Sequence, residues 1–254
     1  DKNLISRNRT INCSGNYEFY DTNFRCWKEE GHGKTNLNKA LQQSCNIYFY
    51  NLIQMIDFEL WSSEVKQFGF GQITNIDLNG EKSGIVPDRK YMNDLYKNRG
   101  GWSTGHLLNL SIGQGEIMVT PIQIVNLMNF IQNEGYAITP HLNKNVDVEK
   151  KIINYDKNVW KIIKQSMYDA VNKDKGTAYK AKINSELAKV YGKTGTAQIC
   201  SNCDLLPHAW FAGFIEFKDK NYSIAIIIEN GGKGSDLSSY IAGKIFKYIM
   251  DNDV

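Results

Sequence analysis

The sequence lacks the features that mark several classes of protein. Its net charge is only +3, and no arginine-rich face is interleaved with aromatic residues, which argues against nucleic-acid binding. The longest apolar run, "SIAIIIE", has the length of a β-strand and is far too short to span a membrane. The chain opens on the polar stretch "DKNLISRNRT", with neither an initiator methionine nor a signal peptide, so we expect a fragment or a processed product. Five cysteines are an odd number, which excludes a fully paired disulfide framework and leaves metal ligands or free thiols.

What is present is typical of a globular protein with an ample core: 254 residues, 42% of them hydrophobic and 22% charged. Residues 1–34 show no clear period, so we expect irregular loops there. Residues 35–56 place apolar side chains three and four positions apart, which predicts one amphipathic helix capped by Thr35 or Asn36. The pattern further predicts helices over 58–68, 121–134 and 157–173, and a long ordered loop region over 69–116.

The C-terminal part of the chain changes period. The runs "AKVYGKTGTAQI", "HAWFAGFIEF" and "NYSIAIIIEN" predict three strands, and "KDK" between the last two predicts a hairpin turn. His208, which opens the second run, is expected to start a strand rather than to bind a metal. An amphipathic helix capped by Ser235 closes the chain. With no repeat and no linker, the sequence predicts one α+β domain over 1–254.

The stretch "GKTGTA", residues 192–197, is the most informative motif in the chain. A lysine on a strand, followed by small residues, lets the backbone of a substrate lie along the strand edge. Lys193 offers positive charge, Thr194 offers a hydroxyl to a carboxylate, and Gly195 leaves the approach open. The alternative is an ordinary strand kinked by glycine, because K-T-G alone is frequent by chance. A phosphate-binding loop is excluded because no G-x-x-x-x-G-K-[ST] is present.

Several other segments accompany this motif in a fixed order. "SCN", residues 44–46, has the form S-x-N, the partner of K-T-G in serine acyltransferases that recognise penicillin. "FRCWKEEGHG", "GFG", "IGQGE", "TPIQ" and "HAWFAGF" complete the set. Together they resemble the transpeptidase domain of class B penicillin-binding proteins, of the elongation type known as penicillin-binding protein 2. The resemblance extends from about residue 11 to the C-terminus.

The resemblance implies a five-stranded antiparallel sheet flanked by helices, with a helical subdomain beside it. It implies D,D-transpeptidation of peptidoglycan stem peptides through a serine acyl-enzyme, which β-lactams also acylate. It further implies a role in cell-wall elongation and cell shape, with a glycosyltransferase partner and no nucleic acid. The location implied is extracytoplasmic, in a protein whose inner-membrane anchor lies outside this sequence.

One departure from the family pattern concerns the nucleophile. The family's S-x-x-K should precede Ser44, yet the only S-x-x-K here is "SEVK", Ser63–Lys66, which follows it. We interpret Ser63 as a surface serine and expect an N-terminally truncated domain whose attacking serine lies before Asp1. This chain alone would then be inactive. The alternative is a family member that lost its nucleophile and acts as a non-catalytic sensor or binding module. A serine β-lactamase is the nearest rival in fold.

The resemblance assigns roles to residues that match its motifs. Ser44 corresponds to the hydroxyl that relays a proton toward the leaving amine, and Asn46 to the amide that binds substrate. Lys193 would supply electrostatic stabilisation. Thr194, Gly195 and Thr196 would bind the substrate, with both hydroxyls on its carboxylate and the N–H of Thr196 in the oxyanion hole.

Cys13, Cys26, His32 and Cys45 form a set sufficient for a tetrahedral zinc ion. The spacing lacks the usual C-x₂-C, so a Cys13–Cys26 disulfide is the alternative. Zinc is favoured because residues 1–34 have little regular structure or core of their own to hold them in place, and because some elongation-type relatives bind zinc beside this segment. Four protein ligands leave no open position, so the predicted site is structural, and Cys45 would hold Ser44 and Asn46 from behind. Cys200 and Cys203 are interpreted as free thiols or a local disulfide.

Overall fold

A computed structural model describes residues 6, 8–199 and 204–253, and within it the chain forms two compact units. The first unit contains the described residues up to Ala40, together with Cys45–Thr120 and His141–Val146. The second contains Leu41–Ser44, Pro121–Pro140 and the described residues from Asp147 onward. The predicted single domain is therefore built from two parts, and one of the places where the chain passes from one to the other lies between Ser44 and Cys45.

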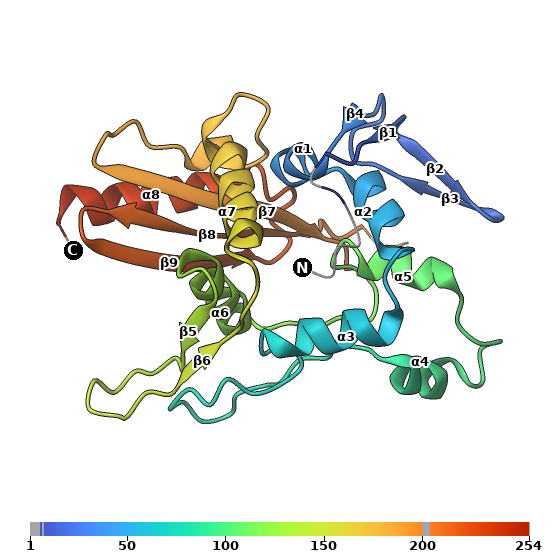
Figure 1. The fold of residues 1–254 in the computed structure, drawn as a ribbon, viewed down its shortest axis with the longest axis horizontal. Helices are drawn as coiled ribbons and strands as arrows, with labels where there is room; N and C mark the ends of the chain where they lie inside the picture. The colour runs from blue at the N-terminus through green and yellow to red at the C-terminus, as the bar shows by residue number, and fades with distance from the viewer. Residues whose placement is uncertain (1–5, 7, 200–203, 254) are drawn as a thin grey trace. The chain divides into compact units, whose positions relative to one another are not determined.

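The first unit combines two short two-stranded sheets with helices (Figure 1). Strand β1 (Ile11–Cys13) pairs with β4 (Gly33–Thr35), and β2 (Asn16–Phe19) pairs with β3 (Thr22–Arg25), both antiparallel. The prediction of irregular loops over 1–34 is wrong for these strands. The helices are α2 (Asn46–Ile53), α3 (Phe58–Gln67), α4 (Arg89–Tyr96) and α5 (Thr104–Leu110).

Aspartate side chains cap the N-termini of two helices of the first unit. Asp57 accepts the N–H of Leu60 at the start of α3, and Asp88 accepts that of Tyr91 at the start of α4. The expected long loop over 69–116 thus contains two short helices. The core of this unit is a buried cluster of Cys13, Cys26, Ala40, Cys45, Ile47, Tyr48, Tyr50, Ile53 and Leu108.

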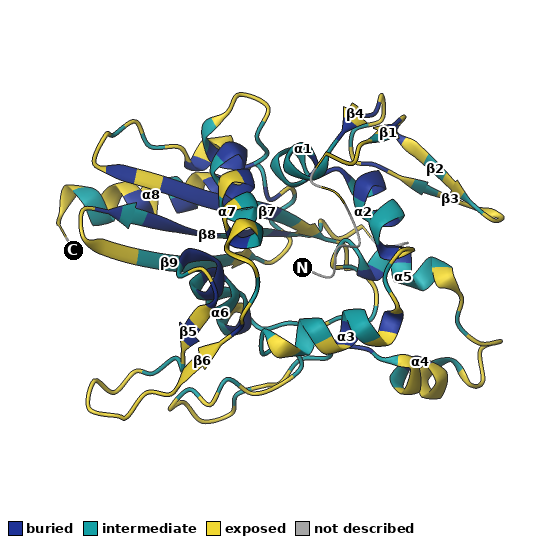
Figure 2. Ribbon diagram, viewed as in Figure 1, coloured by how far each residue is buried: buried dark blue, intermediate teal, exposed yellow. Residues whose placement is uncertain are grey.

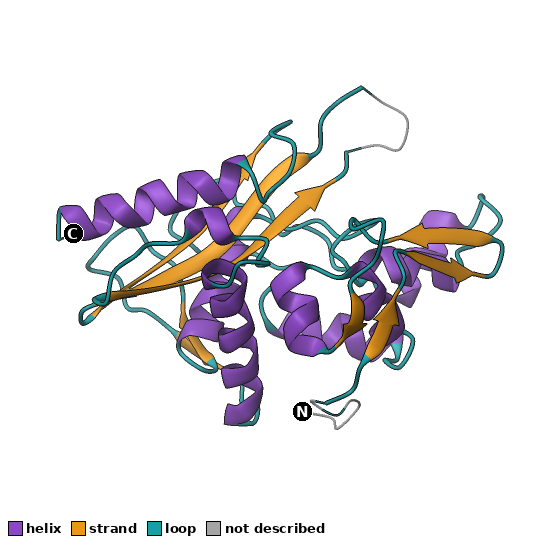
Figure 3. Ribbon diagram, turned by 90° about the horizontal axis from the view of Figure 1, so that it is seen from above, coloured by secondary structure: helices purple, strands orange, loops and turns teal. Residues whose placement is uncertain are grey.

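The second unit is built on an antiparallel sheet with the order β7 (Ala188–Ala197), β8 (His208–Phe217), β9 (Lys220–Ile228). Helix α8 (Leu237–Asp251) covers one face, while α6 (Pro121–Gln132) and α7 (Lys157–Asn172) lie on the other (Figure 3). A small hairpin, β5 (Tyr136–Ile138) with β6 (Lys150–Ile152), and a short 3₁₀ turn at Tyr179–Ala181 complete it. The predicted strands and the expected start of a strand at His208 are confirmed.

The middle strand carries the core of the second unit (Figure 2). Phe211 and Ile215 of β8 are fully buried, and Phe211 meets Phe246 of α8 edge to face. Gly192 and Gly213 are cross-strand partners in the register of β7 and β8. A Cβ on Gly192 would overlap the ring of Phe211, and one on Gly213 would overlap the carbonyl oxygen of Tyr191. The strands beside Lys193 therefore pack more closely than any side chain at these two positions would allow.

The main sheet has three strands among the described residues, so the implied count of five is not reproduced there. Of the helices in the described ranges, none combines the length and apolarity needed to cross a bilayer.

Candidate active site and metal centre

Ser44 lies where a helix ends rather than within one. Helix α1 (Leu37–Gln43) stops one residue before it, and Ser44 adopts a left-handed backbone with φ of +56°. The N–H of Cys45 donates to the carbonyl of Ala40 at 3.0 Å, which is the closing bond of a Schellman motif with Ser44 in its left-handed position. Glycine usually occupies this position, because other residues are strained there. The prediction of one helix over 35–56 is therefore wrong at Ser44, and α2 begins anew at Asn46.

Lys193 meets Ser44 although 149 positions separate them in the sequence. Its Nζ donates to Oγ of Ser44 and to the carbonyl oxygen of Thr194, both at 2.7 Å. Strand β7 holds the lysine through its pairing with Ala212 of β8. Both residues belong to the second unit, so the S-x-N serine and the K-T-G lysine meet within one compact unit.

Burial lowers the pKa of Lys193 from 10.5 to about 8, because removal of water penalises the ammonium. A lysine in this range is still mostly protonated at neutral pH, yet it can release its proton at moderate cost. The pair can therefore hold positive charge and can also pass a proton through the serine hydroxyl.

The remaining residues of the two motifs have different surroundings. Thr194 is buried, whereas Thr196 is exposed and its Oγ1 accepts the N–H of Gly234 at 3.2 Å. Asn46 belongs to the first unit, where its side-chain amide donates to the carbonyl of Arg25 at 3.1 Å. Ser63 is exposed on α3 and donates to the carbonyl of Leu60, as expected for a surface serine.

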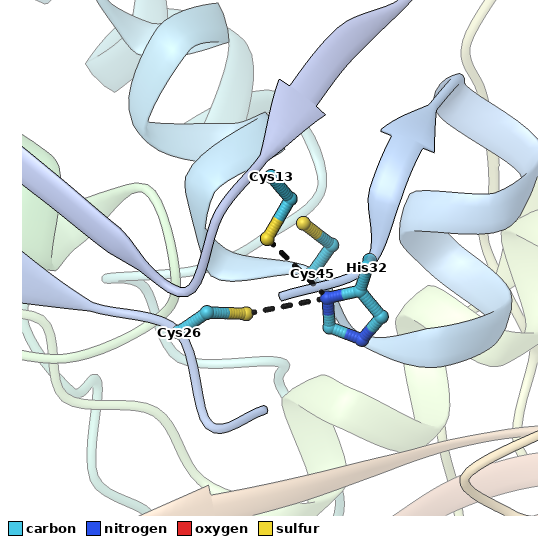
Figure 4. Close-up of side chains that lie close together, drawn as sticks. All are labelled: Cys13, Cys26, His32 and Cys45. Carbon is cyan, nitrogen blue, oxygen red and sulfur yellow. Dashed lines mark hydrogen bonds between the residues drawn. The ribbon is translucent and has the colours of Figure 1, made fainter. Parts of the chain in front are cut away.

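Three cysteines and one histidine converge in the first unit (Figure 4). Cys13 ends β1, Cys26 follows β3, His32 precedes β4 and Cys45 precedes α2. All four are buried, and their ligand atoms lie within 4.8 Å of one another. The structure therefore brings together all four residues of the predicted set.

The distances fit a tetrahedral ion. Nδ1 of His32 lies 3.5 Å from Sγ of Cys13 and 3.4 Å from Sγ of Cys26. Tetrahedral zinc with ordinary bond lengths would separate a ligating nitrogen and sulfur by about 3.5 Å. Cys13, Cys26 and Cys45 are free thiols, so the disulfide alternative is not what the structure contains. The residues present can hold a metal ion.

Contacts within the cluster shift the pKa values of Cys26 and Cys45 in opposite directions. A hydrogen bond from Cys45, followed by one from His32, lowers the pKa of Cys26 against the effect of burial. The hydrogen bond to Cys26 and burial raise the pKa of Cys45. A cation between the sulfurs would stabilise the thiolate form of both.

Contacts around His32 fix its ring and its backbone. Trp27 meets the ring edge to face at 5.5 Å between centroids, and the ammonium of Lys39 donates to the carbonyl of His32 at 2.5 Å. Its Nε2 is buried without a partner among the residues described, so Nδ1 is the nitrogen that faces the sulfurs. Cys200 and Cys203 lie outside the described residues.

Sequence reasoning missed two contributors, Gly234 and Lys39. Gly234 stands in the glycine-rich stretch "NGGKGSD" after the last strand, which is a signal for close backbone approach. Lys39 follows the predicted helix cap by three residues and carries no signal of its own.

The family model and the curated relatives point to the same family. The family described as "Penicillin binding protein transpeptidase domain" matches residues 1–251. Peptidoglycan D,D-transpeptidase MrdA of Haemophilus influenzae is 31% identical over 98% of this chain and 42% of its own length. The protein of the same name from Escherichia coli K12 is 28% identical over the same shares. The chain thus spans about two fifths of the curated relatives it matches.

Solved structures agree with this. A complex of penicillin-binding protein 2 with MreC from Helicobacter pylori has a TM-score of 0.82 and 32% identity, covering 96% of this chain and 46% of that one. Pseudomonas aeruginosa penicillin-binding protein 2 in complex with WCK 5153 has a TM-score of 0.83 and 28% identity, covering 98% and 57%.

Proposed function

The chain belongs to the penicillin-binding protein transpeptidase family, and on that premise we propose that its protein is a peptidoglycan D,D-transpeptidase of the elongation type. The observation that supports this most strongly is the 2.7 Å contact between Lys193 and Ser44, since it joins the two motifs of the family that the sequence contains. The attacking serine is proposed to lie before Asp1, so that residues 1–254 form the later part of the transpeptidase domain.

In the proposed reaction, the serine oxygen attacks the carbonyl carbon between two D-alanines of a stem peptide. The C–N bond breaks, the leaving D-alanine amine takes a proton, and an ester to the serine remains. The amine of a second stem peptide then attacks the ester and releases the serine. A β-lactam acylates the same serine, but its amine stays attached.

Each described residue has a proposed part in this reaction. Ser44 passes a proton toward the leaving amine, with Lys193 holding the hydroxyl and adding positive charge. Asn46 binds the amide of the substrate. Thr194, Gly195 and Thr196 receive its terminal carboxylate, and the N–H of Thr196 donates to the developing oxyanion.

The test is covalent labelling by a fluorescent penicillin. A longer form of the protein that includes the sequence encoded before Asp1 should be labelled, and the 254-residue chain should not. Lys193→Ala in the longer form should slow acylation more than tenfold, as expected when a charge is removed from a site of developing negative charge. Lys247→Ala, at an exposed position on α8, is the matched control. Labelling of the 254-residue chain that Ser63→Ala abolishes would contradict the assignment.

The cluster of Cys13, Cys26, His32 and Cys45 is proposed to bind one structural zinc ion. The argument is the donor set, its complete burial and the sulfur–nitrogen distances of 3.4 and 3.5 Å. Zinc would supply a cross-link between β1, the end of β3, β4 and the start of α2, and no catalytic chemistry.

Elemental analysis after purification without added metal should find about one zinc per chain. Removal by a strong chelator, or His32→Ala, should lower the melting temperature, because the ligands would no longer be cross-linked. The double variant Cys200→Ser with Cys203→Ser should keep its metal. A protein without metal whose Cys13 and Cys26 are found disulfide-bonded would refute the zinc site.

The proposed location is the bacterial cell envelope, on the outer side of the inner membrane. The likeness to a structure containing MreC, together with the family resemblance, supports a place in the elongation machinery with a glycosyltransferase partner. Protease accessibility in spheroplasts tests the location, and co-purification of a glycosyltransferase with the tagged full-length protein tests the partner.

A further inference from the structure

Gly234, in the loop between β9 and α8, lies directly against the end of the strand that carries Lys193. Its N–H donates to Oγ1 of Thr196 at 3.2 Å. A Cβ at Gly234 would overlap the carbonyl oxygens of Gly195 and Trp210. Only glycine therefore lets this loop approach β7 and β8 so closely.

The other side of Gly234 is held by the first turn of α8. Ser238 Oγ donates to the Gly234 carbonyl at 2.8 Å, and the N–H of Ser239 donates to the same oxygen at 3.2 Å. Both serines are fully buried. Two donors thus fix the Gly234 carbonyl, while its N–H faces Thr196.

We propose that Gly234 and Ser238 are positioning residues that orient the Thr196 hydroxyl toward the carboxylate of the acyl donor. The inference rests on the proposed transpeptidase function. A threonine hydroxyl has one proton and two acceptor lone pairs. When one lone pair accepts the N–H of Gly234, the proton must point away from Gly234. Because Thr196 is exposed on the strand, an anion that binds there can accept this proton, and such charge-assisted bonds are strong.

Preorganisation is the benefit of this arrangement. A freely rotating hydroxyl would lose all of that freedom when the substrate binds, whereas the bond from Gly234 has already removed the orientation in which the proton points at Gly234, so less freedom remains to be lost. The α8 turn therefore acts on substrate recognition through Gly234 without touching the substrate.

The test compares acylation by benzylpenicillin with acylation by its uncharged methyl ester, using the longer form of the protein. Gly234→Ala should slow the reaction with the acid about tenfold, as for a lost hydrogen bond to a charged group, and should slow the reaction with the ester much less. Thr196→Val should show the same preference. The double variant should lose no more than Thr196→Val alone, because Gly234 acts through that hydroxyl.

Ser238→Ala keeps the glycine and should slow acylation by the acid more than acylation by the ester, with a smaller effect than Gly234→Ala. If Gly234→Ala fails to fold, Ser238→Ala is the variant that tests the inference. Gly105→Ala on α5 is the control, since its Cβ would lie at an ordinary 3.4 Å from Ser103 Oγ. Equal losses with acid and ester, or losses that add in the double variant, would overturn the inference. Failure of the unmodified longer protein to react would instead refute the proposed function.

Discussion

The buried charge of Lys193 should lower the free energy of unfolding of this protein. Burial lowers its pKa from 10.5 to about 8, which corresponds to roughly 3 kcal/mol of unfavourable free energy while the side chain is charged. The bonds from Nζ to Ser44 and Thr194 recover part of this cost, at about 1 kcal/mol each. We therefore expect Lys193→Met to raise the free energy of unfolding at pH 7 by about 1–2 kcal/mol, although it removes the proposed catalytic charge.

The pH dependence gives the sharper test. Below about pH 8 the lysine is charged in both folded and unfolded chains, so the cost is fully present. Between about pH 8 and pH 10.5 the folded chain has released the proton that the unfolded chain still binds, and the stability contribution of Lys193 rises with pH. The advantage of Lys193→Met should accordingly shrink across this window.

Urea denaturation of the wild type and Lys193→Met at pH 7 and pH 10 measures both effects, with exposed Lys247→Met as the control. A Met variant less stable than the wild type at pH 7 would refute the reasoning. An advantage that stays constant from pH 7 to pH 10 would show that charge burial is not its cause.

Three further predictions concern Ser44, the cysteine cluster and the sheet core. Ser44→Gly should be about 1 kcal/mol more stable than Ser44→Ala in urea, because glycine relieves the left-handed strain at φ of +56°. Both variants should label slowly with penicillin. Equal stabilities of the two variants would contradict the strain at this position. Removal of metal from the longer protein by a chelator should slow acylation, and restoration of zinc should recover the rate, since Cys45 directly follows Ser44. An acylation rate that stays unchanged would show that the cysteine cluster does not support Ser44. Phe246→Ala should lower the free energy of unfolding by about 3–5 kcal/mol, because Phe246 is fully buried against Phe211. Tyr248→Ala, at an exposed position, should change it little. Similar losses of stability in urea for both variants would contradict this packing.

The parts of the fold that sequence predicts well are those with a strong period and clear ends. Helix α6 begins at Pro121 and is followed by Gly135, and β8 coincides with the run "HAWFAGFIEF". Helices α4 and α5 were missed because they are short. Helix α4 has eight residues, little more than two turns, so its apolar period repeats too few times to distinguish it from a loop.

The candidate site divides in the same way. The motif residues Lys193 and Ser44 could be named from the family resemblance. The four residues of the cysteine–histidine cluster could be named from their spacing and the same resemblance. The left-handed turn at Ser44 could not be predicted, because the apolar period of 35–56 continues through it. The break becomes visible only in the structure, from the positive φ of Ser44 and the bond from Cys45 to Ala40. Gly234 depends on contact with Thr196, which lies 38 positions earlier in the chain.

The close pairing of Gly192 with Gly213 limits which substitutions this protein can accept during evolution. Any other residue at either position would collide with Phe211 or with the backbone of Tyr191, so changes in these two codons that replace glycine should be lost with the fold. In a saturation library selected for growth, both positions should tolerate only glycine. Substitutions that alter this part of β7 and β8 without unfolding it must then fall at neighbouring positions where the packing leaves room for a larger side chain.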